Sequence, residues 1–114
     1  MKLLKWLGDS KKNLMEFPSE VIDKIGYALH VAQEGEVHST AKLFKGHGSG
    51  IYEIVNNFNT NAYRAVYIVN LDDMVYVLHA FQKKSKSGIK TPKEDIEIIK
   101  ERLKQLKAML GKRG

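Results

Sequence analysis

The sequence predicts an α+β fold with an N-terminal helical hairpin, a twisted antiparallel sheet of three to four strands, and a C-terminal helix. Three observations predict this fold. Apolar residues recur at helical spacing after Pro18, the stretches between Ile51 and Phe81 are rich in Val, Ile and Tyr, and a second helical stripe follows Thr91. The 114 residues, 43% of them hydrophobic, suit one domain over residues 1–114 with one modest core.

The first third of the chain is expected to hold a short edge strand, over Met1–Trp6, and two helices. Ser10 is predicted to cap a helix over Lys11–Glu16. Pro18 is predicted to be the first residue of the second helix, because its fixed φ suits that position, and Gly35 is predicted to stop it. The apolar side chains of the second helix form one face: Val21, Ile25, Ala28, Leu29 and Ala32. We expect the two helices to form a bent hairpin over one side of the sheet.

The middle of the chain is expected to form the sheet. Gly35–Gly50 looks like a loop with a short extended piece at Ala41–Phe44. Three strands are predicted to follow, over Ile51–Phe58, Ala62–Asn70 and Met74–Phe81. The connections Asn59–Asn61 and Leu71–Asp73 are short and rich in Asn and Asp, so these strands are expected to be antiparallel neighbours in a meander.

The last third is expected to be a basic loop, Gln82–Lys90, followed by a helix. Thr91 is predicted to cap that helix, with Pro92 as its first residue and Glu94 closing a capping box. An apolar stripe runs along the helix to its predicted stop at Gly111: Ile96, Ile99, Leu103, Leu106 and Leu110.

The composition excludes some classes of protein. No cysteine is present, so the chain forms neither disulfides nor thiolate metal sites. The N-terminal apolar run is broken by Lys5 and ends at Asp9, which is too short for a signal peptide, and no stretch has the length of a membrane helix. We therefore expect a cytoplasmic protein with no membrane partner. The net charge of +6 and the pI of about 9.5 favour an acidic partner, most often nucleic acid.

Four segments, in order along nearly the whole chain, resemble one family. The loop and strand Ala41–Ile54, the arginine-bearing strand Tyr63–Tyr67, and the run Val77–Ser85 followed by Thr91-Pro92 resemble the phage-derived, HigB-like branch of the RelE/ParE toxins. Leu14–Pro18 resembles that family's first helix and its bend. The resemblance implies a RelE/ParE-like α+β toxin fold, a ribosome-dependent endoribonuclease activity, and a cognate antitoxin.

The expected function is therefore that of the toxin of a type II toxin–antitoxin system. It is expected to be a metal-independent mRNA endonuclease that inhibits translation and needs no cofactor. The expected partners are the ribosome, mRNA and an antitoxin from a neighbouring gene, which the resemblance suggests is a helix-turn-helix protein. Two alternatives stay open: a non-enzymatic, ParE-like inhibitor of DNA gyrase, and a plain RNA-binding or phage structural protein.

Arg64 is the first candidate for the chemistry. Metal-free RNA cleavage needs a base, an acid and cations that stabilise the phosphorane. Arg64 places a permanent charge in the middle of an apolar strand, where it requires an anion, and the resemblance matches it to the family's catalytic arginine. That anion is either an RNA phosphate or Glu53, a structural partner on the adjacent strand, and the two roles can coexist.

The lysines after the third strand are the second group of candidates. Lys83, Lys84 and Lys86 are predicted to contact phosphate from an edge loop, and the alternative is a solvated loop that discourages edge pairing. We count Lys83 and Lys84 as candidate catalytic residues, since a lysine with a lowered pKa also transfers protons. Lys45, Lys86 and Lys90 are predicted to bind RNA.

His79 and His47 are the conventional acid–base candidates near neutral pH. His79 lies in a strand and is either a proton donor near the site or a buried, hydrogen-bonded side chain that shares a face with Phe81 and Lys83. His47 lies in the glycine-rich segment Lys45–Gly50, which lacks the ending of a P-loop. The histidines and acids show no metal-ligand spacing, so no metal site is expected.

Overall fold

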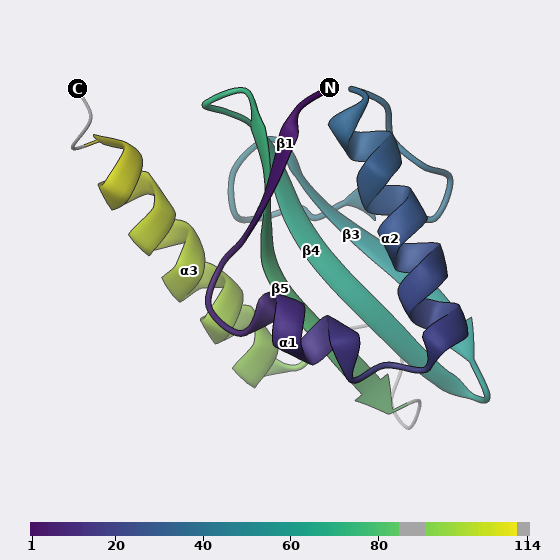
Figure 1. The fold of residues 1–114 in the computed structure, drawn as a ribbon. Coiled ribbons are helices and arrows are strands. Elements are labelled where there is room, and N and C mark those ends of the chain that lie inside the picture. The colour runs from purple at the N-terminus through teal and green to yellow at the C-terminus, as the bar shows by residue number, and fades with distance from the viewer. Residues whose placement is uncertain (85–90, 112–114) are drawn as a thin grey trace.

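The computed structural model describes residues 1–84 and 91–111 (Figure 1). Within them the elements are, in chain order, β1 (Leu3–Trp6), α1 (Ser10–Met15), α2 (Ser19–Gln33), β2 (Ala41–Leu43), β3 (Ile51–Phe58), β4 (Asn61–Leu71), β5 (Met74–Lys84) and α3 (Lys93–Gly111). None of the helices in these ranges is both long enough and apolar enough to cross a bilayer.

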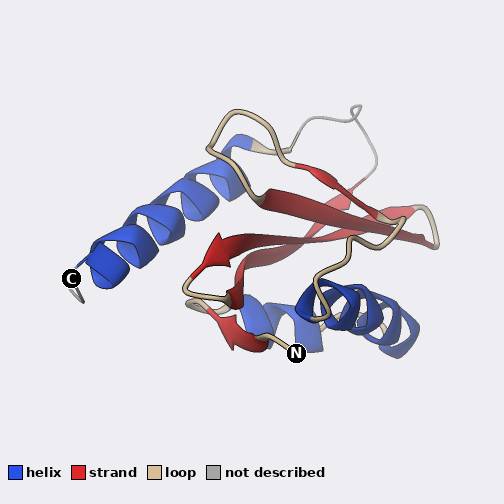
Figure 2. Ribbon diagram, turned by 90° about the horizontal axis from the view of Figure 1, so that it is seen from above, coloured by secondary structure: helices blue, strands red, loops and turns tan. Residues whose placement is uncertain are grey.

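The elements form three layers. A five-stranded sheet in the order β1-β5-β4-β3-β2 separates α1 and α2 on one face from α3 on the other (Figure 2). The α+β class, the edge strand at the N-terminus, the antiparallel meander and the C-terminal helix are therefore confirmed.

The predicted sheet of three to four antiparallel strands is wrong in two respects. The piece at residues 41–43 pairs with β3 as a fifth strand, and β1 runs parallel to β5, with Leu3 opposite Met74 and Trp6 opposite Val77. Both pairings join segments without a tight turn between them. The local sequence predicts strand pairing only where a short turn sets the register, so neither of these two pairings could be predicted from it.

Three predicted boundaries also move. β5 continues through Gln82 and Lys83 to Lys84, which were predicted to be loop, because β4 begins at Asn61 and supplies their hydrogen-bonding partner strand. Ser10 is the first residue of α1 and not its cap, and its buried hydroxyl donates to the Val77 carbonyl at 3.3 Å. Pro18 stands one residue before α2, with the extended ψ of 145° that a cap position has.

Each face of the sheet carries its own apolar cluster. Leu14 and the predicted stripe of α2 pack on the first face, against Ile54, Tyr67 and Val77 among others. The stripe of α3 packs on the second face through Ile99, Leu103 and Leu106, against residues of β3, β4 and β5. The helical spacing read from the sequence thus predicts which side of each helix is buried.

A register shift in β5 decides which side chains face α3. Val66 lies opposite His79 but Tyr67 lies opposite Val77, so Leu78 is an extra residue in β5, which is a β-bulge. Leu78 packs in the cluster on the α3 side and His79 reaches α3 itself, so the bulge turns both towards that helix. Strict alternation from Tyr76, which also faces α3, would have pointed His79 away.

The β3–β4 turn stores backbone strain. Asn59 and Thr60 have φ of 48° and 67°, as a two-residue turn of type I′ requires, and the favoured pair for such a turn is Asn-Gly. Asn tolerates this region, but a β-branched side chain such as that of Thr60 is strained there.

We therefore predict that Thr60→Gly stabilises the protein. Relief of the strain outweighs the added freedom of the unfolded chain, so the free energy of unfolding should rise by about 0.5–1 kcal/mol. Urea denaturation measures the change. Asn59→Gly is the matched control and should change stability less, and a Thr60→Gly protein less stable than wild type would contradict the turn assignment.

Candidate functional site

The α3-facing side of the sheet buries three basic side chains, and two of them, Arg64 and Lys83, lie close together. Arg64, His79 and Lys83 are 8%, 3% and 5% exposed, and apart from Ser10 they are the only buried polar residues in the described ranges. Arg64 lies opposite Phe81 in the β4–β5 ladder, and Lys83 lies two residues further along β5 on the same face. Burial desolvates charges, so a cluster of this kind is a candidate functional site.

Arg64 forms the ion pair with Glu53 that the sequence suggested. Its Nη1 donates to Glu53 Oε1 at 3.0 Å, and both side chains are largely buried. The second carboxylate oxygen of Glu53 accepts a hydrogen bond from the Thr91 hydroxyl at 3.4 Å, just before α3. The Nε of Arg64 is buried and has no hydrogen-bonding partner within the described residues, so one donor of the guanidinium is left for a further acceptor.

Lys83 lies in a strand and not in the edge loop from which it was predicted to contact phosphate, so the alternative of a solvated loop lysine is also wrong. It lies in β5 and is buried, because the strand is longer than expected and the bulge turns its side chain to the α3 face. Burial lowers the pKa of its ammonium group, the nearby positive charge of Arg64 lowers it further, and Glu53 partly opposes both effects. A lysine with a lowered pKa transfers protons more readily near neutral pH than an ordinary one.

Of the other lysines predicted to act on RNA, Lys84 and Lys45 lie within the described residues. Lys84 is the last residue of β5, and its backbone lies opposite Asn61. Lys86 and Lys90 lie outside the described residues. Lys45 is exposed in the segment between β2 and β3, on the side of the molecule that faces α3.

His79 is held by α3 through both of its ring nitrogens. Its Nε2 lies 2.7 Å from Asp95 Oδ1, and its Nδ1 lies 3.4 Å from Nη1 of Arg102, which also donates to the Leu78 carbonyl at 2.9 Å. Since arginine only donates, this geometry suits a neutral imidazole with its proton on Nε2, towards Asp95. Burial lowers the pKa of His79, and although Asp95 opposes this, the charge of Arg102 adds to it.

His47 lies above the site, in the glycine-rich loop. Its ring stacks on Phe44 at a centroid distance of 5.3 Å, and it lines an open hollow of about 630 Å³ together with Lys45, Glu53 and Thr91. His79 borders a different hollow, of about 440 Å³, which opens towards α1. The structure therefore brings His47 and Glu53 together, with Arg64 directly behind Glu53, and sets His79 apart from them.

Sequence reasoning overlooked Asp95 and Arg102 and saw Thr91 only as a cap. One signal was available, because Asp95 and Arg102 are seven residues apart and so lie on the same face of α3, beside Ile99 and Leu103 of the buried stripe. Polar residues that share the buried face of a helix need partners on the surface against which it packs. The partner in this case is His79, which only the packed structure identifies.

The described residues contain no group of three His, Asp or Glu side chains arranged to hold a metal ion. What they do contain is an arginine and a lysine, both desolvated, next to one carboxylate. Such an arrangement is chemically suited to bind an anion and to stabilise negative charge that develops on it.

The fold and this cluster define a small α+β protein with a candidate anion site between its sheet and its C-terminal helix. Residues 12–104 match the model of the family described as phage derived protein Gp49-like, and the chain belongs to that family. The family falls within the RelE/HigB-like toxins in the broad sense, which suggests a toxin of the toxin–antitoxin kind. No curated protein matches the chain significantly.

We predict that His79 makes the stability of the fold depend on pH. Its pKa is lower in the folded protein than the value of about 6.5 in an unfolded chain, so the unfolded chain binds more protons at mildly acidic pH. Its contribution to stability is complete above about pH 6.5 and is lost as the pH falls towards the folded pKa, by at most about 1.4 kcal/mol per pH unit.

Urea denaturation between about pH 7 and pH 5 should show this loss, and His79→Gln should flatten it, because Gln still donates towards Asp95 and does not titrate. His30→Gln, on the exposed surface of α2, is the matched control for the loss of a histidine, and the slope should change more in His79→Gln than in this variant. An equal slope in wild type and His79→Gln would show that another group governs the acid response.

Proposed function

We propose that this protein is the toxin of a type II toxin–antitoxin pair and acts as a metal-independent, ribosome-dependent mRNA endonuclease. One observation carries the proposal. Arg64 is buried with a free Nε donor beside the desolvated Lys83, and Glu53 is the carboxylate that the structure sets against these two cations. An RNA phosphate in reach of the Arg64 Nε would supply an acceptor for this donor.

The proposed reaction is an internal transfer within RNA. Lys83, in its neutral form, takes the proton of a 2′-hydroxyl, whose oxygen attacks the adjacent phosphorus. The bond from phosphorus to the 5′-oxygen breaks, and the products are a 2′,3′-cyclic phosphate and a 5′-hydroxyl. Arg64 stabilises the charge on the phosphorane, and His47, which overhangs the same hollow, donates the proton that the leaving 5′-oxygen takes.

His79 is assigned a supporting role in this scheme. Both of its ring nitrogens face side chains of α3, and its hollow opens on the other side of β5. His79 positions the start of α3. Thr91, just before this helix, donates a hydrogen bond to Glu53, and Glu53 in turn orients Arg64.

The net charge and the family support the proposed partners, which are the ribosome, mRNA and an antitoxin. A surface of net charge +6 favours encounter with the ribosome and with mRNA, and the toxin needs an antitoxin that neutralises it, proposed to be a helix-turn-helix protein from a neighbouring gene. Co-expression with the neighbouring gene should restore growth.

A cell-free translation reaction tests the activity directly. A reporter mRNA should be cut only when ribosomes translate it, with primer extension locating the cuts, and the protein should leave gyrase supercoiling unaffected in a parallel assay. Intact mRNA together with inhibited supercoiling would establish the gyrase alternative. Intact mRNA and active gyrase, with RNA bound, would leave a plain RNA-binding protein.

We predict that the double variant Arg64→Gln/Glu53→Gln folds but cleaves far more slowly than wild type. Replacing both partners keeps amides in place of the charges, whereas Arg64→Ala alone removes the ion-pair partner of the largely buried Glu53, at a cost of up to about 3–5 kcal/mol. The rate of mRNA cleavage should fall by about a hundred- to a thousandfold, as when one preorganised donor is lost. A folded double variant that cleaves at the wild-type rate would remove Arg64 from the mechanism.

We predict that Lys83→Arg separates binding from proton transfer. Arginine keeps the positive charge but does not deprotonate, so the variant should still bind RNA while its cleavage rate falls by about a hundredfold. The wild-type rate should rise with pH up to the lowered pKa of Lys83, and the variant should lose that rise. An unchanged pH profile in Lys83→Arg would assign the base to another residue.

A further inference from the structure

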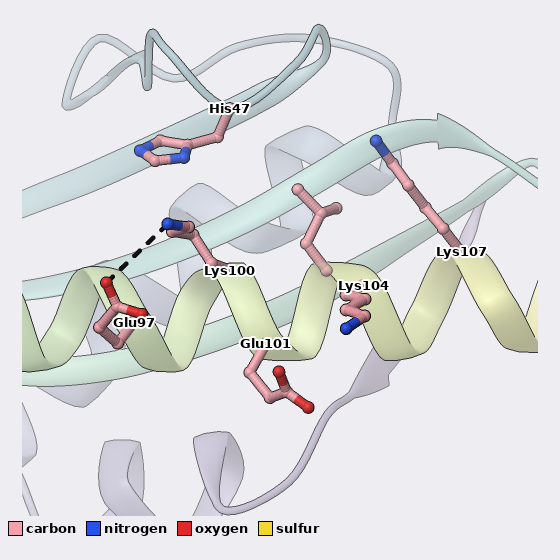
Figure 3. Close-up of a pocket in the computed structure, with 7 residues that line it drawn as sticks. His47, Glu97, Lys100, Glu101, Lys104 and Lys107 are labelled. Atoms are coloured by element: carbon pink, nitrogen blue, oxygen red, sulfur yellow. Dashed lines mark ion pairs between the residues drawn. The ribbon is translucent and has the colours of Figure 1, made fainter.

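A second open hollow, of about 580 Å³, lies along α3 beneath the glycine-rich loop (Figure 3). Its floor is the face of α3 that carries Lys100, Leu103, Lys104 and Lys107, and His47 of the loop overhangs it. We call this hollow the α3 groove. His47 also lines the hollow over Glu53, so the α3 groove and the candidate site meet at this one side chain.

The cations of the α3 groove are spaced along its length. Lys100, Lys104 and Lys107 follow one another at intervals of four and three residues, which places them in a row on one side of the helix over about 10 Å. Lys107 reaches the loop, since its Nζ lies 3.7 Å from the point where a Cβ on Gly48 would stand. The row is thus bounded by α3 on one side and the loop on the other.

The acids of the α3 groove leave two of these lysines unpaired. Glu97 lies 3.9 Å from Lys100, with both side chains more than half exposed, and Glu101 accepts a hydrogen bond from Gln105 instead. Within the described residues no carboxylate lies at ion-pair distance from Lys104 or Lys107. Their charges are available to an anionic ligand.

The loop adds a flat ring to this row of charge. One face of the His47 imidazole rests on Phe44, with ring planes inclined by 23°. Figure 3 shows the ring lying above Lys100, over the open part of the groove. A stacked ring beside a row of lysines is how proteins hold single-stranded RNA, because every base has a face that stacks and every nucleotide carries a phosphate.

We propose that the α3 groove holds a single-stranded segment of RNA next to the nucleotide that is cut, with its phosphates on Lys104 and Lys107 and one base on His47. This inference rests on the proposed function, since it extends the substrate of the same site. The proposed ligand is RNA and not an acidic protein segment. A row of cations alone would suit either ligand. The stacked ring of His47, which lines both the groove and the candidate site, favours a nucleic-acid strand that passes from one to the other.

Binding of an RNA that cannot be cut tests the proposal without ribosomes. The probe is a fluorescent 2′-O-methyl uridine octamer, and its affinity is measured by fluorescence anisotropy at several salt concentrations. Lys104→Ala/Lys107→Ala should weaken binding about tenfold and reduce the slope of log affinity against log salt by about 1.4, or about 0.7 for each phosphate lost. His47→Ala should weaken binding at every salt concentration with little change in slope, and His47→Phe should restore it.

The matched control is Lys11→Ala/Lys12→Ala, which removes the same charge from exposed positions on α1, across the sheet from α3. Equal losses in the two double variants would reduce the effect to net charge and overturn the proposal. The proposal would also be overturned if the wild-type protein failed to bind the octamer. The same holds if Lys104 and Lys107 were needed to bind a poly-glutamate peptide but not to bind RNA.

Failure of the proposed function gives a different result. If the groove variants bind like wild type while translating ribosomes still yield cut mRNA, the groove assignment fails and the nuclease remains. If the groove variants lose binding as expected but wild-type protein cuts no mRNA, the groove binds RNA and the nuclease assignment fails.

Discussion

The extra residue at Leu78 sets the direction of every side chain that follows it in β5, because successive residues of a strand point to opposite faces. With the bulge in place, His79, Phe81 and Lys83 face α3, and Ala80 packs beneath α2. Without it the two sets would exchange faces, and Lys83 would lie away from Arg64. The bulge therefore decides whether the buried cations meet, and the packing of α3 on that face holds it in place through the Arg102–Leu78 hydrogen bond.

The cations that the bulge brings together cost the fold stability. A desolvated arginine and a desolvated lysine repel each other, and the ion pair with Glu53 offsets part of the cost of burying Arg64. A core of apolar residues of similar size would be as stable or more so. Under the proposed function, the unsatisfied Arg64 donor would serve as a preorganised group for an anion, and the cost in stability would be offset by tighter binding of that anion.

The C-terminal helix connects the two surfaces on which the proposals rest. Its apolar stripe packs on the sheet, and Asp95 and Arg102 fasten its buried face to the His79 ring. The same helix then borders the hollow over Glu53 with Ile96 and forms the floor of the α3 groove with its lysines. A shift of α3 would therefore change both surfaces together.

The α+β class, the helical faces, the meander and its turns could be predicted from the chain alone, because they depend on side-chain periodicity and on local backbone preferences. The sequence also singled out Arg64 and Glu53, since a charge within an apolar strand needs a partner nearby. The parallel pairing of β1, the length of β5 and the contacts of His79 with Asp95 and Arg102 were decided only by the tertiary structure. These features depend on which distant segments pack together and on one extra residue in the β4–β5 pairing, and neither produces a periodic pattern of side chains in the sequence.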